Sequence, residues 1–103
     1  MWKDDPDARQ RFEMAFRTGS LAIIENAARK LTTVTLGDAL RILVVMAEKH
    51  DERYARAAAR WVARAISERR LDLVEAQAAL ELVAQLPEQP GAVSALRRSF
   101  CGP

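Results

Sequence analysis

The sequence predicts an all-α protein of five or six short helices packed as antiparallel pairs, and three observations support this fold class. Apolar residues recur at helical spacing in several segments. Capping residues, glycines and prolines separate those segments, and we find neither the alternation typical of strands nor a glycine-rich phosphate loop. The chain has 103 residues, of which 50% are hydrophobic, which is enough for one domain with a core. We therefore expect one helical-bundle domain over residues 1–103.

The first two helices are expected on either side of Gly19. Asp5 is a candidate N-cap, and Pro6 suits the first position of a helix. Gly19 can adopt the left-handed conformation that ends a helix, and Ser20 can cap a second helix over about Leu21–Lys30. A single helix bent at Gly19 is the alternative, because one glycine inside a helix costs only about 1 kcal/mol. The stripe expected to be buried on the first helix is Ala8, Phe12, Ala15 and Phe16.

The third helix, over about Leu36–Lys49, is expected at the centre of the domain. Thr35 and Asp38 form a capping-box pattern at its start. The segment is apolar over most of its circumference, as is typical of a helix covered on several sides. Its narrow polar edge consists of Gly37, Asp38, Arg41, Glu48 and Lys49. Self-association through an apolar face of this helix is one consequence we consider, because Val44 and Val45 on its opposite edges also need partners.

The second half of the chain shows three further helices. Asp51 is a candidate N-cap for a helix that ends at about Arg69, and Asp72 forms a second capping box with Glu75. The fifth helix should run over about Leu73–Leu86, before prolines that cannot continue the backbone hydrogen bonds. A short helix over about Ala92–Ser99 and a frayed tail from about residue 100 complete the chain. The residues expected to be buried on the fifth helix are Leu73, Ala76, Leu80, Leu82 and Val83.

Four arginines form the one surface feature of the sequence that indicates a partner. They recur at steps of three, four and four residues, and therefore fall within about 80° of arc on a helix. They span about 16 Å, which is enough to contact several phosphates of a nucleic acid. The alternative is a solvated face on which Glu52–Arg56 and Arg64–Glu68 form ordinary ion pairs. We call this set the arginine ridge: Arg53, Arg56, Arg60 and Arg64.

Charge and aromatic residues argue against a dedicated nucleic-acid-binding protein. The formal net charge is only +2, with a mildly basic middle and a mildly acidic C-terminal third. Tyr54 and Trp61 fall on the apolar face opposite the arginine ridge, where they would not stack on bases. Nucleic-acid binding therefore ranks behind contact with another protein.

No set of residues with catalytic spacing is present. His50 is the only histidine and follows a helix, where the helix dipole favours a cation. Cys101 is the only cysteine, and we interpret it as an inert thiol rather than a redox or intermolecular disulfide site. We therefore expect no catalytic, cofactor-binding or metal-binding residues, and no enzymatic activity.

The composition indicates a cytoplasmic protein of a GC-rich bacterium, with no membrane association. A single cysteine excludes an internal disulfide, which fits a reducing compartment. The N-terminus has no apolar run of the kind found in a signal peptide. The longest apolar run, Ile42–Ala47, is far shorter than the roughly 20 residues of a membrane span. Arginine greatly outnumbers lysine, which is typical of a GC-rich genome.

A weak internal similarity appears when the chain is shifted by 37 residues. Each of the two segments contains a capped apolar helix, a turn and a second helix. This arrangement resembles the helix pair of HEAT-like or tetratricopeptide-like α-solenoids, although it has no diagnostic motif of either class. Alternatively, any two core helices would align in this way. The aligned residues are Leu36, Ala39, Leu43, Val45, Met46 and Ala47 with Leu73, Ala76, Leu80, Leu82, Val83 and Ala84.

Taken together, these patterns predict a non-catalytic interaction or regulatory module. A protein partner or self-association fits the apolar helices best. The alternative is a nucleic-acid-binding accessory protein that uses the arginine ridge.

Overall fold

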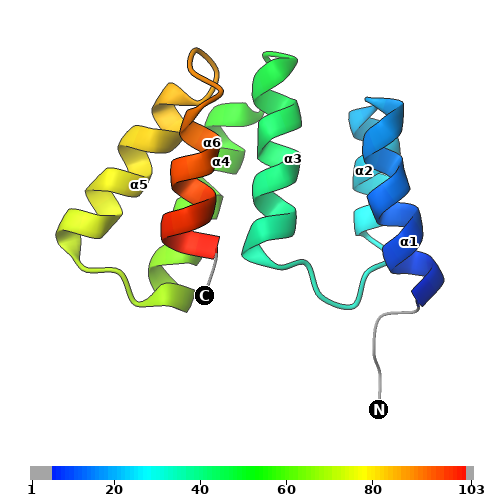
Figure 1. Ribbon diagram of the computed structural model, residues 1–103, viewed down its shortest axis with the longest axis horizontal. Coiled ribbons are helices and arrows are strands. Elements are labelled where there is room, and N and C mark those ends of the chain that lie inside the picture. The colour runs from blue at the N-terminus through cyan, green and yellow to red at the C-terminus, as the bar shows by residue number, and fades with distance from the viewer. Residues whose placement is uncertain (1–5, 102–103) are drawn as a thin grey trace. The chain divides into compact units, whose positions relative to one another are not determined.

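The computed structural model describes residues 6–101, and all regular structure in this range is helical. The helices form antiparallel pairs along the chain, which confirms the predicted all-α class (Figure 1). No helix in the described range is long and apolar enough to cross a membrane. The elements are α1 (Pro6–Ala15), η1 (Phe16–Thr18), α2 (Leu21–Ala28), α3 (Leu36–Glu48), α4 (Tyr54–Arg69), α5 (Leu73–Gln85), α6 (Ala92–Leu96) and η2 (Arg97–Cys101).

The described chain divides into two compact units between Thr35 and Leu36. The first contains α1, η1 and α2, and the second contains α3 to η2. The single domain expected over residues 1–103 stays a prediction.

The first unit is a hairpin of α1 and α2 that reverses direction at Gly19. Gly19 has a φ of +71°, a conformation that costs glycine little, so the two helices are separate rather than one bent helix. The Ser20 hydroxyl accepts a hydrogen bond from the Ile23 amide at 3.4 Å and so caps α2 as expected. Phe12 and Ile24 are fully buried, and Phe16 lies edge-on against the Phe12 ring. The proposed N-cap Asp5 lies outside the described residues.

In the second unit, α3 contributes more buried residues than any other helix. Val44 and Val45 are half-buried, so the largest exposed apolar side chains do not lie on this helix. Asp38, which we expected on the polar edge, is buried instead. It lies in the first turn of α3, where free backbone amides and the helix dipole stabilise a carboxylate.

The link between α3 and α4 is longer than the expected tight turn. His50 adopts a left-handed conformation with a φ of +51°, and α4 begins only at Tyr54. Asp51 is therefore not the N-cap. Its carboxylate instead accepts a hydrogen bond from the Arg53 amide at 2.8 Å, and its carbonyl accepts one from the Tyr54 amide at 3.0 Å. This local turn competes with a helix that starts at Asp51.

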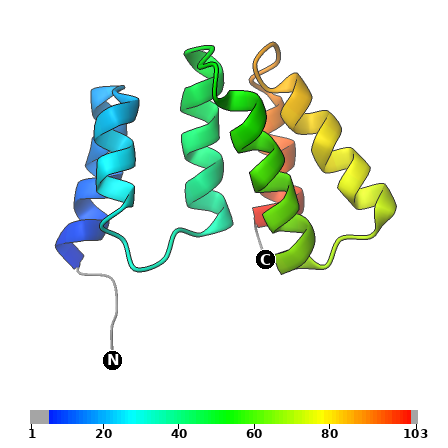
Figure 2. The ribbon, with the colours of Figure 1, turned by 180° about the vertical axis from the view of Figure 1, so that it is seen from behind.

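Helices α3, α4 and α5 and the continuous segment of α6 and η2 form a closed ring, which Figure 2 shows from behind. Helix α3 contacts α4, α4 contacts α5, α5 contacts α6, and η2 returns to α3. Trp61 of α4 is buried inside this ring. Its Nε1 donates a hydrogen bond to the Leu36 carbonyl at 3.0 Å, and its ring meets the Phe100 ring edge-on at 6.4 Å.

The C-terminal end is more ordered than the tail we expected from about residue 100. Helix α6 continues into the π-helical segment η2, so the chain stays helical to Cys101. Phe100 is buried against Trp61, and this contact holds the last turn in place. Residues 102–103 lie outside the described range.

Helix α5 starts at the capping box predicted from the sequence. The Asp72 carboxylate accepts from the Glu75 amide at 2.8 Å, and the Glu75 carboxylate accepts from the Asp72 amide at 3.0 Å. At the other end of α5, the Tyr54 hydroxyl donates a hydrogen bond to the Val83 carbonyl at 2.6 Å. This bond sets the start of α4 level with the last turns of α5.

Tyr54 provides a direct test of this contact, because it is the only tyrosine in the chain. Burial raises the pKa of Tyr54 to about 12, from an ordinary value of about 10. The folded state favours the neutral phenol of Tyr54. The stabilisation linked to its raised pKa is therefore complete below about pH 10 and is lost as the pH rises toward about 12. Ultraviolet titration of the folded chain should give a phenolate midpoint near 12, against about 10 in denaturant. Tyr54→Phe should weaken the alkaline loss of stability, and a folded midpoint near 10 would contradict the buried hydrogen bond.

Candidate interaction surfaces

The structure places the arginine ridge on one face of α4, opposite its buried residues. Arg53 is the N-cap residue of α4, and its backbone is close to helical, with φ −82° and ψ −4°. The other three arginines lie within the helix. The expected face is therefore present, and its role stays a prediction. The residues buried on the opposite side are Ala58, Trp61, Val62 and Ala65.

Two of the four arginines make local ion pairs. The Arg53 guanidinium donates to both carboxylate oxygens of Asp51, at 3.0 and 3.2 Å, and holds the pKa of Asp51 below its ordinary value. The Arg64 guanidinium pairs with Glu68, as the i,i+4 spacing predicts. These two arginines therefore stabilise their own turn and helix.

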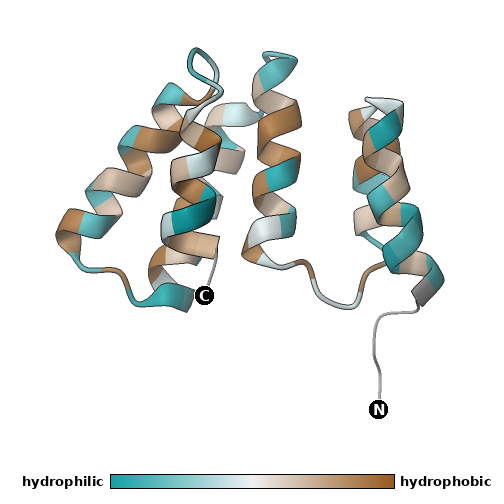
Figure 3. Ribbon diagram, viewed as in Figure 1, coloured by the Kyte–Doolittle hydropathy of each residue, from teal (hydrophilic) through white to brown (hydrophobic). Residues whose placement is uncertain are grey.

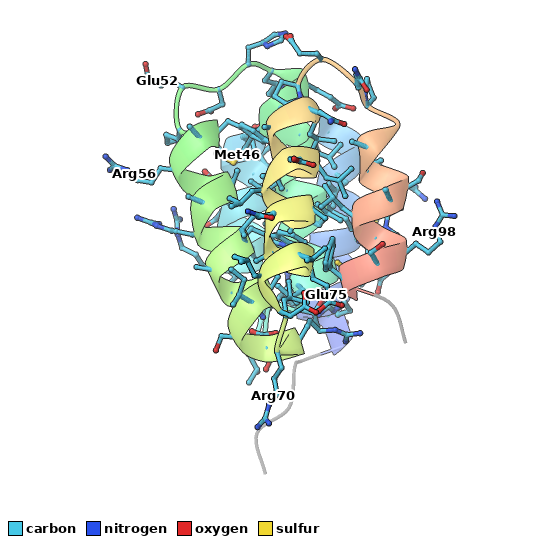
Figure 4. All side chains as sticks on the ribbon, turned by 90° about the vertical axis from the view of Figure 1, so that its left-hand side faces the viewer. Met46, Glu52, Arg56, Arg70, Glu75 and Arg98 are labelled. Atoms are coloured by element: carbon cyan, nitrogen blue, oxygen red, sulfur yellow. The ribbon has the colours of Figure 1, made fainter. Side chains whose placement is uncertain are left out.

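Arg56 and Arg60 remain exposed, without a hydrogen bond or an ion pair to another described residue. The expected pair between Glu52 and Arg56 does not form, because Glu52 lies in the turn before α4 and not on the helix. In Figure 4, Glu52 lies above Arg56 on the same side of the molecule, and their charged ends are apart. The ridge thus has two adjacent exposed cations without an ion pair among the described residues, rather than four.

Helix α5 exposes Leu73 and Leu80, which sequence reasoning had placed in the core. Leu73 is 73% exposed and Leu80 is 50% exposed, while Ala79 and Val83 are buried. Figure 3 shows that hydrophobic residues occur along much of α5. A helix that is apolar around its circumference has two stripes that could be buried. The stripe of smaller residues faces the ring here, and its small side chains allow α5 to approach its neighbours closely.

The exposed leucines of α5 lie on the side of this helix that faces α4. Figure 4 looks onto α5, with α4 on one side and α6 on the other, and Glu75 lies on the α6 side. At about 100° per residue, Leu73 and Leu80 lie roughly 140–160° around the helix from Glu75. They therefore border the line along which α4 and α5 meet.

Apolar residues of α4, most of them alanines, are exposed along the same line. The hydrogen bond of Trp61 to Leu36 identifies the flank of α4 that faces α3. The exposed residues Ala55, Ala59 and Ile66 lie about 120–160° around the helix from Trp61, on the flank toward α5. We define the α4/α5 surface as this set of exposed apolar residues: Ala55, Ala59, Ala63, Ile66, Leu73, Leu80 and Ala84.

The remaining chemically reactive residues do not form a site. His50 is exposed in the turn after α3, and its backbone amide donates to the Ala47 carbonyl. Burial raises the pKa of the Cys101 thiol, although Arg97 and Arg69 lower it in part, so the unreactive thiol form is favoured. Among the described residues, no three His, Cys, Asp or Glu side chains are grouped closely enough to hold a metal ion.

The residues that align when the chain is shifted by 37 positions differ in their burial. Leu36 and Leu43 of α3 are buried, whereas the aligned Leu73 and Leu80 of α5 are exposed. The two helix pairs therefore share a pattern but use its leucines differently. No protein-family model matches this chain, and no curated protein or solved structure gives a significant match to it.

The exposure of the α5 leucines has a measurable consequence for stability. Leu73→Gln removes an apolar side chain that is already in water, so we expect the free energy of unfolding to change by no more than about 0.5 kcal/mol. Leu86→Ala removes a buried leucine and should cost about 2–5 kcal/mol. Urea unfolding followed by circular dichroism compares the two, and a large loss in Leu73→Gln would show that this side chain is packed.

Proposed function

We propose that this chain is a non-catalytic protein–protein interaction module and that the α4/α5 surface is its contact site. The observation that carries this proposal is the exposure of Leu73 and Leu80 on one face of α5. Scattered exposed leucines are common, but a group on one helix face, continuous with an alanine-rich flank, is typical of an interface. The proposal includes a cytoplasmic location, which the single cysteine supports.

A photo-crosslinking amino acid in place of Leu80 tests this function in cells that produce the protein. We expect discrete crosslinked products, because this side chain lies at the centre of the proposed contact. The same group in place of Arg98, which is exposed on η2 outside the α4/α5 surface, is the matched control. The proposal fails if the crosslinking amino acid at position 80 gives no crosslinked product, or if positions 80 and 98 give the same products.

The exposed pair Arg56 and Arg60 favours a second candidate function, contact with nucleic acid. The two guanidinium groups are one turn apart and have no partner among the described residues, so both are available to phosphates. Against this candidate, Trp61 is buried and Tyr54 is bonded to Val83, so neither stacks on a base.

Fluorescence anisotropy of labelled DNA at about 50 and 200 mM salt tests the second candidate. Binding should fall steeply with salt and should be weaker in Arg56→Ala/Arg60→Ala. The variant Arg97→Ala/Arg98→Ala removes the same charge from another helix and should bind as the unmodified chain does. No binding at the lower salt, or an equal loss in both variants, would exclude the ridge as the contact.

A further inference from the structure

We propose that the occupant of the α4/α5 surface is a second copy of this chain, held in a twofold dimer with Arg56 of each copy against Glu81 of the other. This inference rests on the proposed function and adds the identity of the partner. It follows from the charges on the borders of the surface and from the register of the two helices.

The α4/α5 surface has a basic border on one side and an acidic border on the other. Arg56 follows the exposed alanines around α4, on the side away from α5. Glu81 lies beyond Leu73 and Leu80 around α5, on the side away from α4. Neither residue has a hydrogen bond or an ion pair within the described chain. Helix α5 has no basic residue to pair with Glu81, since none occurs between residues 71 and 96.

These two charges lie at the same level along the helices. Helices α4 and α5 are antiparallel, and the hydrogen bond from Tyr54 to Val83 fixes their register. Arg56 lies two residues after Tyr54, and Glu81 lies two residues before Val83. At a rise of about 1.5 Å per residue, the Arg56 Cα is therefore displaced about 3 Å along α4 from the Tyr54 Cα, and the Glu81 Cα about 3 Å along α5 from the Val83 Cα, in the same direction.

A twofold axis parallel to the helices makes this arrangement self-complementary. Such an axis places α4 of one copy against α5 of the other, and every contact occurs twice. Because the rotation does not change the level along the axis, Arg56 meets Glu81 of the second copy at both borders. A perpendicular axis would instead place α4 against α4 and bring the arginine ridges together, which like charges disfavour.

The same axis matches large side chains with small ones. By the register of the Tyr54 bond, Leu80 is level with the turn of α4 that contains Ala55 and Ala59. Leu73 is level with the turn that contains Ala63 and Ile66. Leu80 therefore faces the short side chains of Ala55 and Ala59 on α4 of the second copy, and Leu73 faces Ala63 beside the larger Ile66, so the two apolar surfaces can interdigitate.

Sedimentation velocity of the full chain over a range of concentrations tests this dimer. We expect the mass to rise from one chain to two with concentration. Glu81→Arg alone and Arg56→Glu alone should each stay monomeric, because each places like charges at both borders. An equimolar mixture of the two variants should form a heterodimer, since the introduced arginine at position 81 then faces the introduced glutamate at position 56. The double variant should dimerise by itself.

Controls separate this inference from the proposed function. Arg98→Glu changes a charge outside the surface and should dimerise like the unmodified chain, and circular dichroism should show that all variants stay helical. The dimer is excluded if the unmodified chain stays monomeric, or if the single variants at positions 56 and 81 dimerise normally. Should the crosslinker at position 80 then capture a different protein, the interaction function stands with another occupant. If it captures nothing, the function fails as well.

Discussion

The arrangement of residues 36–101 depends on the contacts of the Trp61 indole with α3 and η2. The indole joins three parts of the ring, since it lies on α4, donates to the first residue of α3 and meets Phe100 of η2. Burial of an indole also requires a partner for its N–H, and the Leu36 carbonyl meets this requirement. The orientation of α4 about its own axis follows from this contact, and with it the direction in which every other α4 side chain points.

The surfaces of α4 follow from that orientation. Because Trp61 faces α3 and η2, the arginine ridge faces away from the ring and the alanines lie on the flank toward α5. Tyr54 then fixes α5 against this flank through the Val83 carbonyl. The large side chains of α5 are left in water, beside a strip of alanines. The α4/α5 surface is therefore a consequence of how the ring closes, and not of an unusually apolar segment.

The charges of the second unit divide into two kinds. Arg53 with Asp51, and Arg64 with Glu68, are neighbours in sequence and organise their own turn and helix. Exposed pairs of this kind contribute little to the stability of the whole protein. Arg56 and Glu81 have no such partner. Glu52 lies in the turn before α4 and does not pair with Arg56, and α5 contains no basic residue that could pair with Glu81. In the dimer that we propose, they act in recognition, because complementary charges on the borders of an apolar patch set the orientation of a partner.

The amino-acid sequence by itself determined the class of the fold, the helix ends at Gly19, Ser20 and Asp72, and the Arg64–Glu68 pair, because these depend on interactions between residues close in sequence. The cap of Ser20, the left-handed Gly19 and the Asp72–Glu75 capping box are examples. Only the tertiary structure decided which stripe of α5 is buried, that Asp38 is covered and that Phe100 is held in the ring. Periodicity in α5 allows either Leu73 with Leu80 or Ala79 with Val83 to face inward, and contacts with distant helices choose between them. For this reason the arginine ridge was visible in the sequence, whereas the α4/α5 surface emerged only once two helices were placed side by side.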